Sequence, residues 1–534
     1  HSASAFVHKM LFPAVHELGF KAGQTCYKLW HNAYTLPDVW EALEFLKGFP
    51  AMYRNWWWNL VENDPLHVAV ETILLLSIIY IMASRSTEGY KDGKDKLSTK
   101  ETEGLLADWK RTRAPLAPSV EEDGGDEECL IVHEQDGKML TVSTLNNPGT
   151  KSKVMNFCNF DFLGFQTSSL LKNASIEALV KYGCGSCGPR GFYGTIDKHL
   201  ELEDAISKFV KTDGAIMYSD GASTCSSTVA AFAKRGDVLV VDEGIYEPLM
   251  TGVYLSRANV HWFKHNDMED LERVLDGLHK TDLKLGRKPN ALRRFIVVEG
   301  LYKNLGTIAP LDKIVDLKNK YNYRLILDES FSFGTLGETG RGALEHFNKR
   351  HMYDAEIVTI ALENSIGSVG GVTVGNEEVV DHQRLSGAGY CFSASAPPFT
   401  ASAAIAAIEH MESNVDCIEK LQSNMKLMYG CLEEILTKLV VTSDERSPII
   451  VLQLPKESEY EADIIKGIMQ ECLSRGIAIV STGQDACGHL RTELAPALRI
   501  TVSALHTEAD IKTAVNVLEE SSKDIIKKFP LYSP

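Results

Sequence analysis

The segment Val238-Leu239-Val240-Val241-Asp242 is a run of four apolar residues that ends in a carboxylate, and similar runs recur through the middle of the chain. Their apolar residues are continuous and do not alternate with polar ones, which indicates strands buried on both faces. Longer helical patterns separate the runs. The sequence therefore predicts an α/β domain over residues 151–399, with a mainly parallel sheet flanked by helices. The other runs are Ala215–Tyr218, Phe295–Glu299, Leu325–Asp328 and Ile357–Ile360.

The last part of the chain, residues 400–534, has a different pattern. A long helix is followed by strand-like segments that alternate with helices, which predicts a smaller C-terminal α+β domain. The strand-like segments are Ile449–Leu454, Ala478–Ser481 and Leu498–Ser503. In the larger domain several strands end in an acidic residue, and open parallel sheets bind ligands at the carboxyl ends of their strands. We therefore expect the functional site at that edge of the larger sheet.

Composition excludes some classes of function. The chain has 534 residues, 44% hydrophobic content and a formal net charge of −17. A nucleic-acid binder needs a basic face to neutralise phosphates, so we expect no nucleic-acid partner. The 11 cysteines are scattered, which suits a reducing compartment. Cys184 and Cys187 form a C-x-x-C pair, but no second pair follows at zinc spacing, so we expect no metal site.

The N-terminal part contains one long apolar segment, residues 66–83, which predicts a single transmembrane helix. The aromatic-rich run Met52–Trp58 precedes it, and such rings favour the membrane–water interface, so 53–84 forms one membrane segment. A buried core helix or an interfacial helix is the alternative. Glu71 is costly in lipid and is expected to face a partner helix. Basic residues follow the segment and place the large C-terminal part in the cytosol: Arg85, Lys91, Lys94, Lys96 and Lys100.

Two stretches flank this segment. Residues 1–52 carry no pattern that assigns them a structure. Residues 85–150 are charged and broken by proline and glycine, which predicts a linker with one short helix and then the start of the globular region.

A series of motifs follows in a fixed order. The glycine-rich stretch Gly185–Thr195 comes first, and it is followed by Tyr218–Gly221, Asp242-Glu243, Glu299–Tyr302, Leu327–Ser330, Phe392–Pro398 and Leu498–Ile500. In this order and spacing the chain resembles the α-oxoamine synthases, fold-type-I pyridoxal-phosphate enzymes that condense an amino acid with an acyl-CoA. The resemblance implies an aminotransferase-like large domain and pyridoxal 5′-phosphate as the cofactor.

The resemblance also assigns the cofactor positions one by one. Asp328 stands where the family has the carboxylate at the pyridine nitrogen, although a strand-end Asp also caps turns. Tyr246 stands where the family stacks a His on the ring, and Phe331 where a second His is usual. Asn364 stands where the family has the lysine that forms the Schiff base with the cofactor. No lysine occurs between Lys349 and Lys420, and an amide cannot form an imine with the cofactor aldehyde.

A preserved scaffold with replaced catalytic residues resembles the non-catalytic subunits of heteromeric serine palmitoyltransferases. The resemblance implies a heterodimer with a lysine-bearing catalytic subunit, which holds the cofactor, and also small membrane activator and regulatory subunits. The family's site lies between two chains, so Cys187, Gly188 and Arg190 are expected to form a wall of the partner's substrate pocket, unless the turn only packs the interface. Ser393 and Ser395 are expected near the partner's cofactor phosphate, unless they form a polar turn.

The resemblance implies that the heteromer condenses L-serine with palmitoyl-CoA at the endoplasmic reticulum membrane, the first step of sphingolipid biosynthesis. Arg499 matches the family's carboxylate-binding arginine and is expected here to be a relic or a structural ion-pair partner. His199 and His506 are expected to be structural. Two other interpretations stay open: a non-enzymatic membrane scaffold or regulator that reuses the fold, and an autonomous α-oxoamine synthase with an atypical site.

Overall fold

The computed structural model describes residues 58, 61–63, 65–84, 98–112, 130–144, 147–186, 188–288, 291–349, 353–456, 459–482 and 494–529. The chain divides into two compact units, His1–Pro118 and Ser119–Pro534. Three parts of the sequence predictions lie outside the described residues. They are the N-terminal stretch 1–52, the aromatic-rich run Met52–Trp58 except for Trp58 itself, and Cys187.

The described residues of the first unit include the helices α4 (Pro65–Ser84) and α5 (Thr99–Thr112). Helix α4 coincides with the apolar segment 66–83, so this segment is helical. The predicted transmembrane span is not confirmed: none of the described helices combines the length and the apolar character that a membrane span requires. Helix α5 is the short helix expected between residues 85 and 150, and Ser98 caps it by accepting a hydrogen bond from the Glu101 N–H at 3.3 Å.

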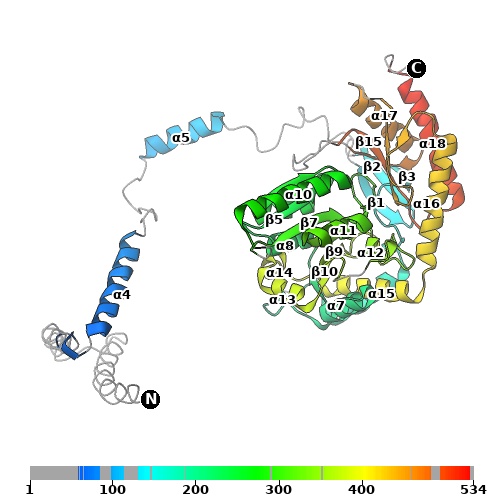
Figure 1. The fold of residues 1–534 in the computed structure, drawn as a ribbon. Helices are drawn as coiled ribbons and strands as arrows, with labels where there is room; N and C mark the ends of the chain where they lie inside the picture. The colour runs from blue at the N-terminus through cyan, green and yellow to red at the C-terminus, as the bar shows by residue number, and fades with distance from the viewer. Residues whose placement is uncertain are drawn as a thin grey trace. The chain divides into compact units, whose positions relative to one another are not determined.

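The second unit is built around a seven-stranded sheet with the order β4-β10-β9-β8-β7-β5-β6 (Figure 1). The run β6-β5-β7-β8-β9 is parallel throughout, whereas β10 pairs antiparallel with both β4 and β9. The sheet is thus mainly parallel, as predicted. Its strands are β4 (Gly214–Tyr218), β5 (Val238–Asp242), β6 (Asn259–Phe263), β7 (Arg294–Glu299), β8 (Arg324–Asp328), β9 (Ile357–Ala361) and β10 (Gly371–Gly375).

The register of the parallel strands brings polar side chains together at one edge of the sheet. Glu299 at the end of β7 pairs with Asp328 at the end of β8, and Asp328 pairs with Thr359 on β9. All three residues are buried. The carboxyl edge expected to carry the site therefore exists, and it lies inside the protein.

Helices surround this sheet, and four of them, α6, α8, α10 and α13, begin at a residue whose side chain caps them. Asp220 accepts a hydrogen bond from the Ser223 N–H at the start of α8, and Asp267 caps α10 in the same way. Figure 1 shows α8, α10 and α11 around the sheet. The helices are α6 (Ser169–Tyr182), α7 (Asp197–Val210), α8 (Gly221–Phe232), α9 (Glu247–Ser256), α10 (Met268–Leu285), α11 (Leu311–Tyr321), α12 (Ala343–His346), α13 (Glu377–Ser386), α14 (Ala388–Phe392) and α15 (Pro398–Ser413).

The C-terminal α+β part is built from two distant segments of the chain. One sheet has the order β1-β2-β3-β13 and the other β11-β12-β15-β14, and α16, α17 and α18 lie beside them (Figure 1). The first sheet uses β1 (Leu130–Asp136), β2 (Met139–Thr144) and β3 (Asn147–Asn156) with β13 (Ile477–Ala478). The remaining elements are α16 (Asp416–Ile435), β11 (Val440–Val441), β12 (Ile449–Gln453), α17 (Glu461–Ser474), β14 (Val480–Thr482), β15 (Ala497–Thr501) and α18 (Glu508–Ile526).

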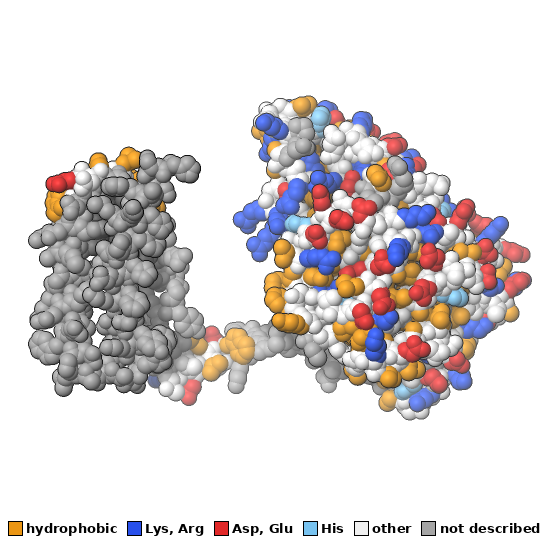
Figure 2. All heavy atoms as spheres, turned by 90° about the horizontal axis from the view of Figure 1, so that it is seen from below, with side chains coloured by type: hydrophobic (Ala, Val, Ile, Leu, Met, Phe, Trp, Pro, Cys, Tyr) orange, Lys and Arg blue, Asp and Glu red, His pale blue; other side chains and the backbone are white. Residues whose placement is uncertain are grey.

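Two boundaries thus differ from the expected domains. Residues 85–150 are expected to hold the linker and the start of the globular region, and the strands β1 to β3, which begin at Leu130, belong to the C-terminal part and not to the large domain that follows them in the chain. Helix α15, expected at the start of the small domain, packs against α6 and α7 of the large domain. Figure 2 shows one face on which acidic, basic and apolar side chains are mixed, as is ordinary for a water-exposed domain surface.

His506 joins the two segments of the C-terminal part. Its imidazole stacks on Phe157 with ring centroids 4.0 Å apart, and its Nε2 lies 2.9 Å from the Asn156 carbonyl oxygen. Its Nδ1 accepts a hydrogen bond from the Ser503 N–H at 3.1 Å, so the ring is neutral. Burial lowers the pKa of His506 to about 4.

We predict that this histidine makes the fold acid-sensitive. The unfolded chain binds a proton at this imidazole below pH ~6.5, whereas the folded chain binds it only near pH 4. The free energy of unfolding should therefore fall as the pH drops through this window, by up to about 3 kcal/mol. Urea denaturation at pH 7 and pH 4.5 measures the loss, and His506→Gln should show less of it. If wild type and His506→Gln lose the same free energy of unfolding between pH 7 and pH 4.5, His506 is not the group responsible.

Candidate functional site

Asp328 is the centre of a buried polar cluster at the carboxyl edge of the large sheet. Its Oδ1 accepts hydrogen bonds from Ser330 Oγ and Thr359 Oγ1, both at 2.7 Å, and from Cys225 Sγ at 3.3 Å. Its Oδ2 is buried and has no partner among the described residues. Burial raises the pKa of Asp328, and the hydrogen bonds oppose that rise. Thus one carboxylate oxygen is held by the chain itself and the other is left unpaired.

An aromatic layer covers this cluster. The Tyr246 hydroxyl lies 3.0 Å from Cys225 Sγ, next to Asp328. The Tyr246 ring meets the Phe331 ring edge to face at 5.8 Å, and Phe331 meets Phe160 at 4.9 Å. Tyr246 and Phe331, the two predicted replacements of histidine, therefore lie side by side above the predicted Asp328.

Arg499 lies at the far end of the same aromatic layer. Its guanidinium stacks over the Phe160 ring, 4.5 Å from the centroid. Burial lowers its pKa, and its Nε has no hydrogen-bond partner within the described ranges. A structural ion pair, one of the two expectations for Arg499, is not among the described interactions; the arginine is held instead by stacking.

Asn364 completes the cluster. It lies in the loop after β9, it is buried, and its side-chain amide donates a hydrogen bond to the Ser330 carbonyl oxygen at 2.7 Å. The structure therefore brings all four predicted positions together: Asp328, Tyr246, Phe331 and Asn364. The amide is fixed by this bond and offers no amine to an aldehyde.

Three further residues of this cluster were missed by sequence reasoning. Cys225 is on α8, Thr359 on β9 and Glu363 directly before Asn364. Glu363 accepts a hydrogen bond from the Gly221 N–H at 3.2 Å. None of the three stands in a motif that distinguishes it from ordinary core or loop residues; only the fold places them.

The cofactor implied by the resemblance does not fit these residues as they stand. A pyridinium nitrogen needs an accessible carboxylate oxygen, but the free Oδ2 of Asp328 is buried. Two bulky rings that are each 5% exposed, Tyr246 and Phe331, pack against each other in this cluster. Position 364 carries an amide, and the Lys303 amine, 5.8 Å from the centroid of the Tyr246 ring, is paired with Glu247 at 3.1 Å. The arrangement thus offers neither the ring site nor the covalent anchor.

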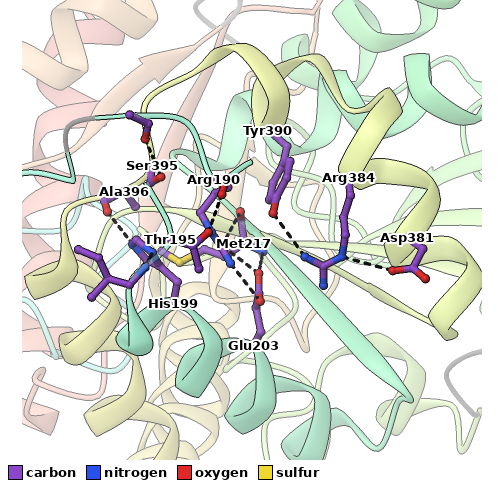
Figure 3. Close-up of polar contacts among 12 residues, drawn as sticks. Arg190, Thr195, His199, Glu203, Met217, Asp381, Arg384, Tyr390, Ser395 and Ala396 are labelled. Carbon is purple, nitrogen blue, oxygen red and sulfur yellow. Dashed lines mark hydrogen bonds and ion pairs between the residues drawn. The ribbon is translucent and has the colours of Figure 1, made fainter. Parts of the chain in front are cut away.

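The glycine-rich turn is fastened to the interior by Arg190 (Figure 3). Its guanidinium pairs with Glu203 on α7 through two bonds of 2.9 and 3.2 Å. It also donates to Thr195 Oγ1 at 3.1 Å and to the Met217 carbonyl oxygen at 3.3 Å. Arg190 is 6% exposed. The expectation that its side chain lines a partner's pocket is therefore not supported by its geometry, because the arginine points inward and anchors the turn.

The turn is also bonded to the segment that contains Ser393 and Ser395. Ser395 donates to the Gly188 carbonyl oxygen through its N–H at 2.9 Å and its hydroxyl at 2.8 Å. A side chain at Gly194 would place its Cβ 1.9 Å from the same oxygen, so this contact requires glycine. Ser393 is partly exposed and its hydroxyl lies 3.0 Å from Ser219 Oγ.

His199, expected to be structural, is buried in the same region. Its Nε2 lies 2.8 Å from the Ala396 carbonyl oxygen, and its Nδ1 accepts from the Ile196 N–H at 3.1 Å. Burial lowers its pKa. It thus connects α7 to the serine segment and, like His506, lies apart from the Asp328 cluster.

The Arg190–Glu203 pair should dominate the stability of the turn. Glu203→Leu leaves a buried guanidinium without its counter-charge and should lower the free energy of unfolding by about 3–5 kcal/mol. The double variant Arg190→Met/Glu203→Leu should lose less than the sum of the two single variants, because no unpaired charge remains. Urea denaturation of the four proteins gives the coupling. Additive losses would show that the two side chains do not depend on each other.

Residues 152–518 match the model of the family "Aminotransferase class I and II". The chain is 40% identical over 466 residues to "Long chain base biosynthesis protein 1" of Arabidopsis thaliana, covering 86% of this chain and 92% of that protein. It is 36% identical over 479 residues to "Serine palmitoyltransferase 1" of Dictyostelium discoideum, covering 88% and 96%.

A solved structure has the same fold. It is a serine palmitoyltransferase from S. paucimobilis with a bound PLP–myriocin aldimine, and it matches with a TM-score of 0.67 and 24% identity over 80% of this chain and 98% of that one. With the predicted motif order, the mainly parallel sheet and the sequence matches, the classification is clear. The chain belongs to the class I and II aminotransferase family and, within it, to the family of long chain base biosynthesis protein 1 and serine palmitoyltransferase 1.

Proposed function

We propose that this chain is the non-catalytic, membrane-attached subunit of a heteromeric serine palmitoyltransferase. The heteromer condenses L-serine with palmitoyl-CoA and releases 3-ketosphinganine, CO2 and CoA, the first step of sphingolipid biosynthesis. A lysine-bearing partner subunit holds pyridoxal phosphate and carries out the chemistry. This chain stabilises the partner and completes its site. Small membrane activator and regulatory subunits belong to the same proposal.

The observation that carries this proposal is Asn364. It stands in the buried cluster with Asp328 and Tyr246, where a catalytic chain of this family would need an amine. Its amide is already bonded to the Ser330 carbonyl oxygen, and the sequence contains no lysine between Lys349 and Lys420. Covalent catalysis must then come from another polypeptide.

A partner surface is supported by the exposed side chains around the glycine-rich turn. Phe192, Tyr193 and Phe392 are 68%, 103% and 87% exposed, and the Ser395–Gly188 bonds join the two segments that carry them. Exposed aromatic side chains are typical of interfaces. We place the contact with the catalytic subunit here, with Gly188, Cys187 and Ser393 at its edge and L-serine and acyl-CoA at the shared site.

Membrane attachment is supported by helix α4. Its apolar side chains are exposed and have no apolar core to cover them within the described residues: Leu66, Val70, Ile73, Leu74 and Leu76. The free energy of such a helix falls when its apolar side chains move out of water. We place it at the endoplasmic reticulum membrane, with the second unit on the cytosolic side.

Co-expression tests the main proposal. The chain alone should form no long-chain base from serine and palmitoyl-CoA, because it lacks the imine-forming amine. Together with a lysine-bearing homologue it should form 3-ketosphinganine, and the two chains should co-purify. The control is the same pair with the partner's lysine replaced by alanine, which should be inactive. Turnover by the purified single chain, or activity of the partner that never depends on this chain, would overturn the proposal.

The membrane proposal has its own test. Replacing Ile73 and Leu76 with lysine should move the full chain from the membrane pellet to the supernatant after cell fractionation, because charged side chains are costly in lipid. The matched control replaces the exposed Leu105 and Leu106 of α5 with lysine and should leave the chain in the pellet. Retention of both variants in the pellet would place the attachment elsewhere.

A further inference from the structure

Helix α8 begins directly after β4, and its first turn lies beside the Asp328 cluster. Cys225, one turn into α8, contacts both Asp328 and Tyr246. The first N–H groups of a helix have no partner within the helix. Together with the helix dipole they make a common binding site for phosphate groups. The start of α8 is therefore the place in this cluster where a phosphorylated cofactor would be held.

Two carboxylates of the chain already occupy these N–H groups. Asp220 accepts from the Ser223 N–H at 2.7 Å, and Glu363 accepts from the Gly221 N–H at 3.2 Å. Burial, with a smaller contribution from the neighbouring Asp220, raises the pKa of Glu363 to about 7. Near neutral pH the helix start thus faces one carboxylate and a second, partly charged one. A phosphate added here would meet charge of its own sign.

Space is also lacking at this position. A Cβ built on Gly221 would lie 2.4 Å from Glu363 Oε1 and 2.7 Å from the Ala361 Cβ. The Glu363 side chain therefore lies directly against the first turn of α8. A phosphate cannot reach the Gly221 N–H unless Glu363 moves away.

The neighbouring ring position is filled as well. Tyr246 and Phe331 are each 5% exposed, and Asp328 is 1% exposed. An open cavity large enough for a pyridine ring would expose the side chains that line it. Instead the Tyr246 hydroxyl is hydrogen-bonded to Cys225 beside Asp328, and Phe331 packs on both Tyr246 and Phe160.

We propose that this chain fills its own cofactor pocket: Asp220 and Glu363 take the place of a phosphate, and Tyr246 and Phe331 take the place of a pyridine ring. Pyridoxal phosphate then does not bind to this chain even without a covalent bond. Restoring a lysine at position 364 alone does not restore binding. The proposal refines the non-catalytic role above, but it rests on contacts within this one chain.

The first test uses the purified full chain and pyridoxal phosphate. Wild type and Asn364→Lys should retain no cofactor after dialysis and should show no aldimine absorbance. Asn364→Lys combined with Glu363→Ser, Tyr246→His and Phe331→Ala should gain retained cofactor and a borohydride-stable mass increase. Uptake of one equivalent by wild type or by Asn364→Lys alone would overturn the proposal. So would a folded fourfold variant that retains none.

The second test uses inorganic phosphate and a single substitution, so it does not depend on the folding of the fourfold variant. Phosphate should bind Glu363→Ser at least about tenfold more tightly than wild type, measured by calorimetry. Glu363→Gln is the matched control: it removes the charge, keeps the bulk, and should bind less tightly than Glu363→Ser. Equal affinity in wild type and Glu363→Ser contradicts the proposal. Neither test measures long-chain base formation, so its outcome is separate from that of the co-expression assay.

Discussion

The centre of this fold depends on one buried carboxylate. Asp328 ends a central strand with no cation among its described hydrogen-bond partners, so its charge can be tolerated only if nearby groups donate hydrogen bonds to it. Ser330, Thr359 and Cys225 do so, each from a different element. This requirement ties the end of β8 to β9 and to α8. It also explains why these elements stay in register with one another.

The glycine-rich turn shows a similar dependence on an internal charge pair. Arg190 and Glu203 are both nearly buried, so each needs the other. Their pairing fixes the base of the turn, while Phe192 and Tyr193 at its tip remain exposed. A rigid base with an apolar tip is a suitable geometry for an interface, because the contact surface is ordered before a partner arrives.

Much of this architecture could be predicted from the sequence, for physical reasons that also explain the failures. Strands buried on both faces leave continuous apolar runs, and all five predicted runs are strands. The edge strand β6 contains Asn259 and His261, and β10 is bounded by Gly371 and Gly375, so neither shows such a run. The strands β1 and β3 are mostly exposed and rich in polar residues, so they show no apolar run that separates them from the linker. Position within a motif identified Asn364 and Tyr246. It could not show that Arg190 points inward or that Glu363 reaches α8, because those contacts join segments with no common sequence signal.

The joining of β3 to β13 has a consequence for biosynthesis. Their paired residues, Met155 with Ile477 and Asn156 with Ala478, are separated by about 320 residues. At bacterial or eukaryotic elongation rates the ribosome needs roughly 16 to 64 s to make that stretch. During this interval the strands β1 to β3 exist without the edge that later closes their sheet. The nascent chain therefore presents an open β-edge until β13 has been made, and we expect molecular chaperones to shield that edge until then.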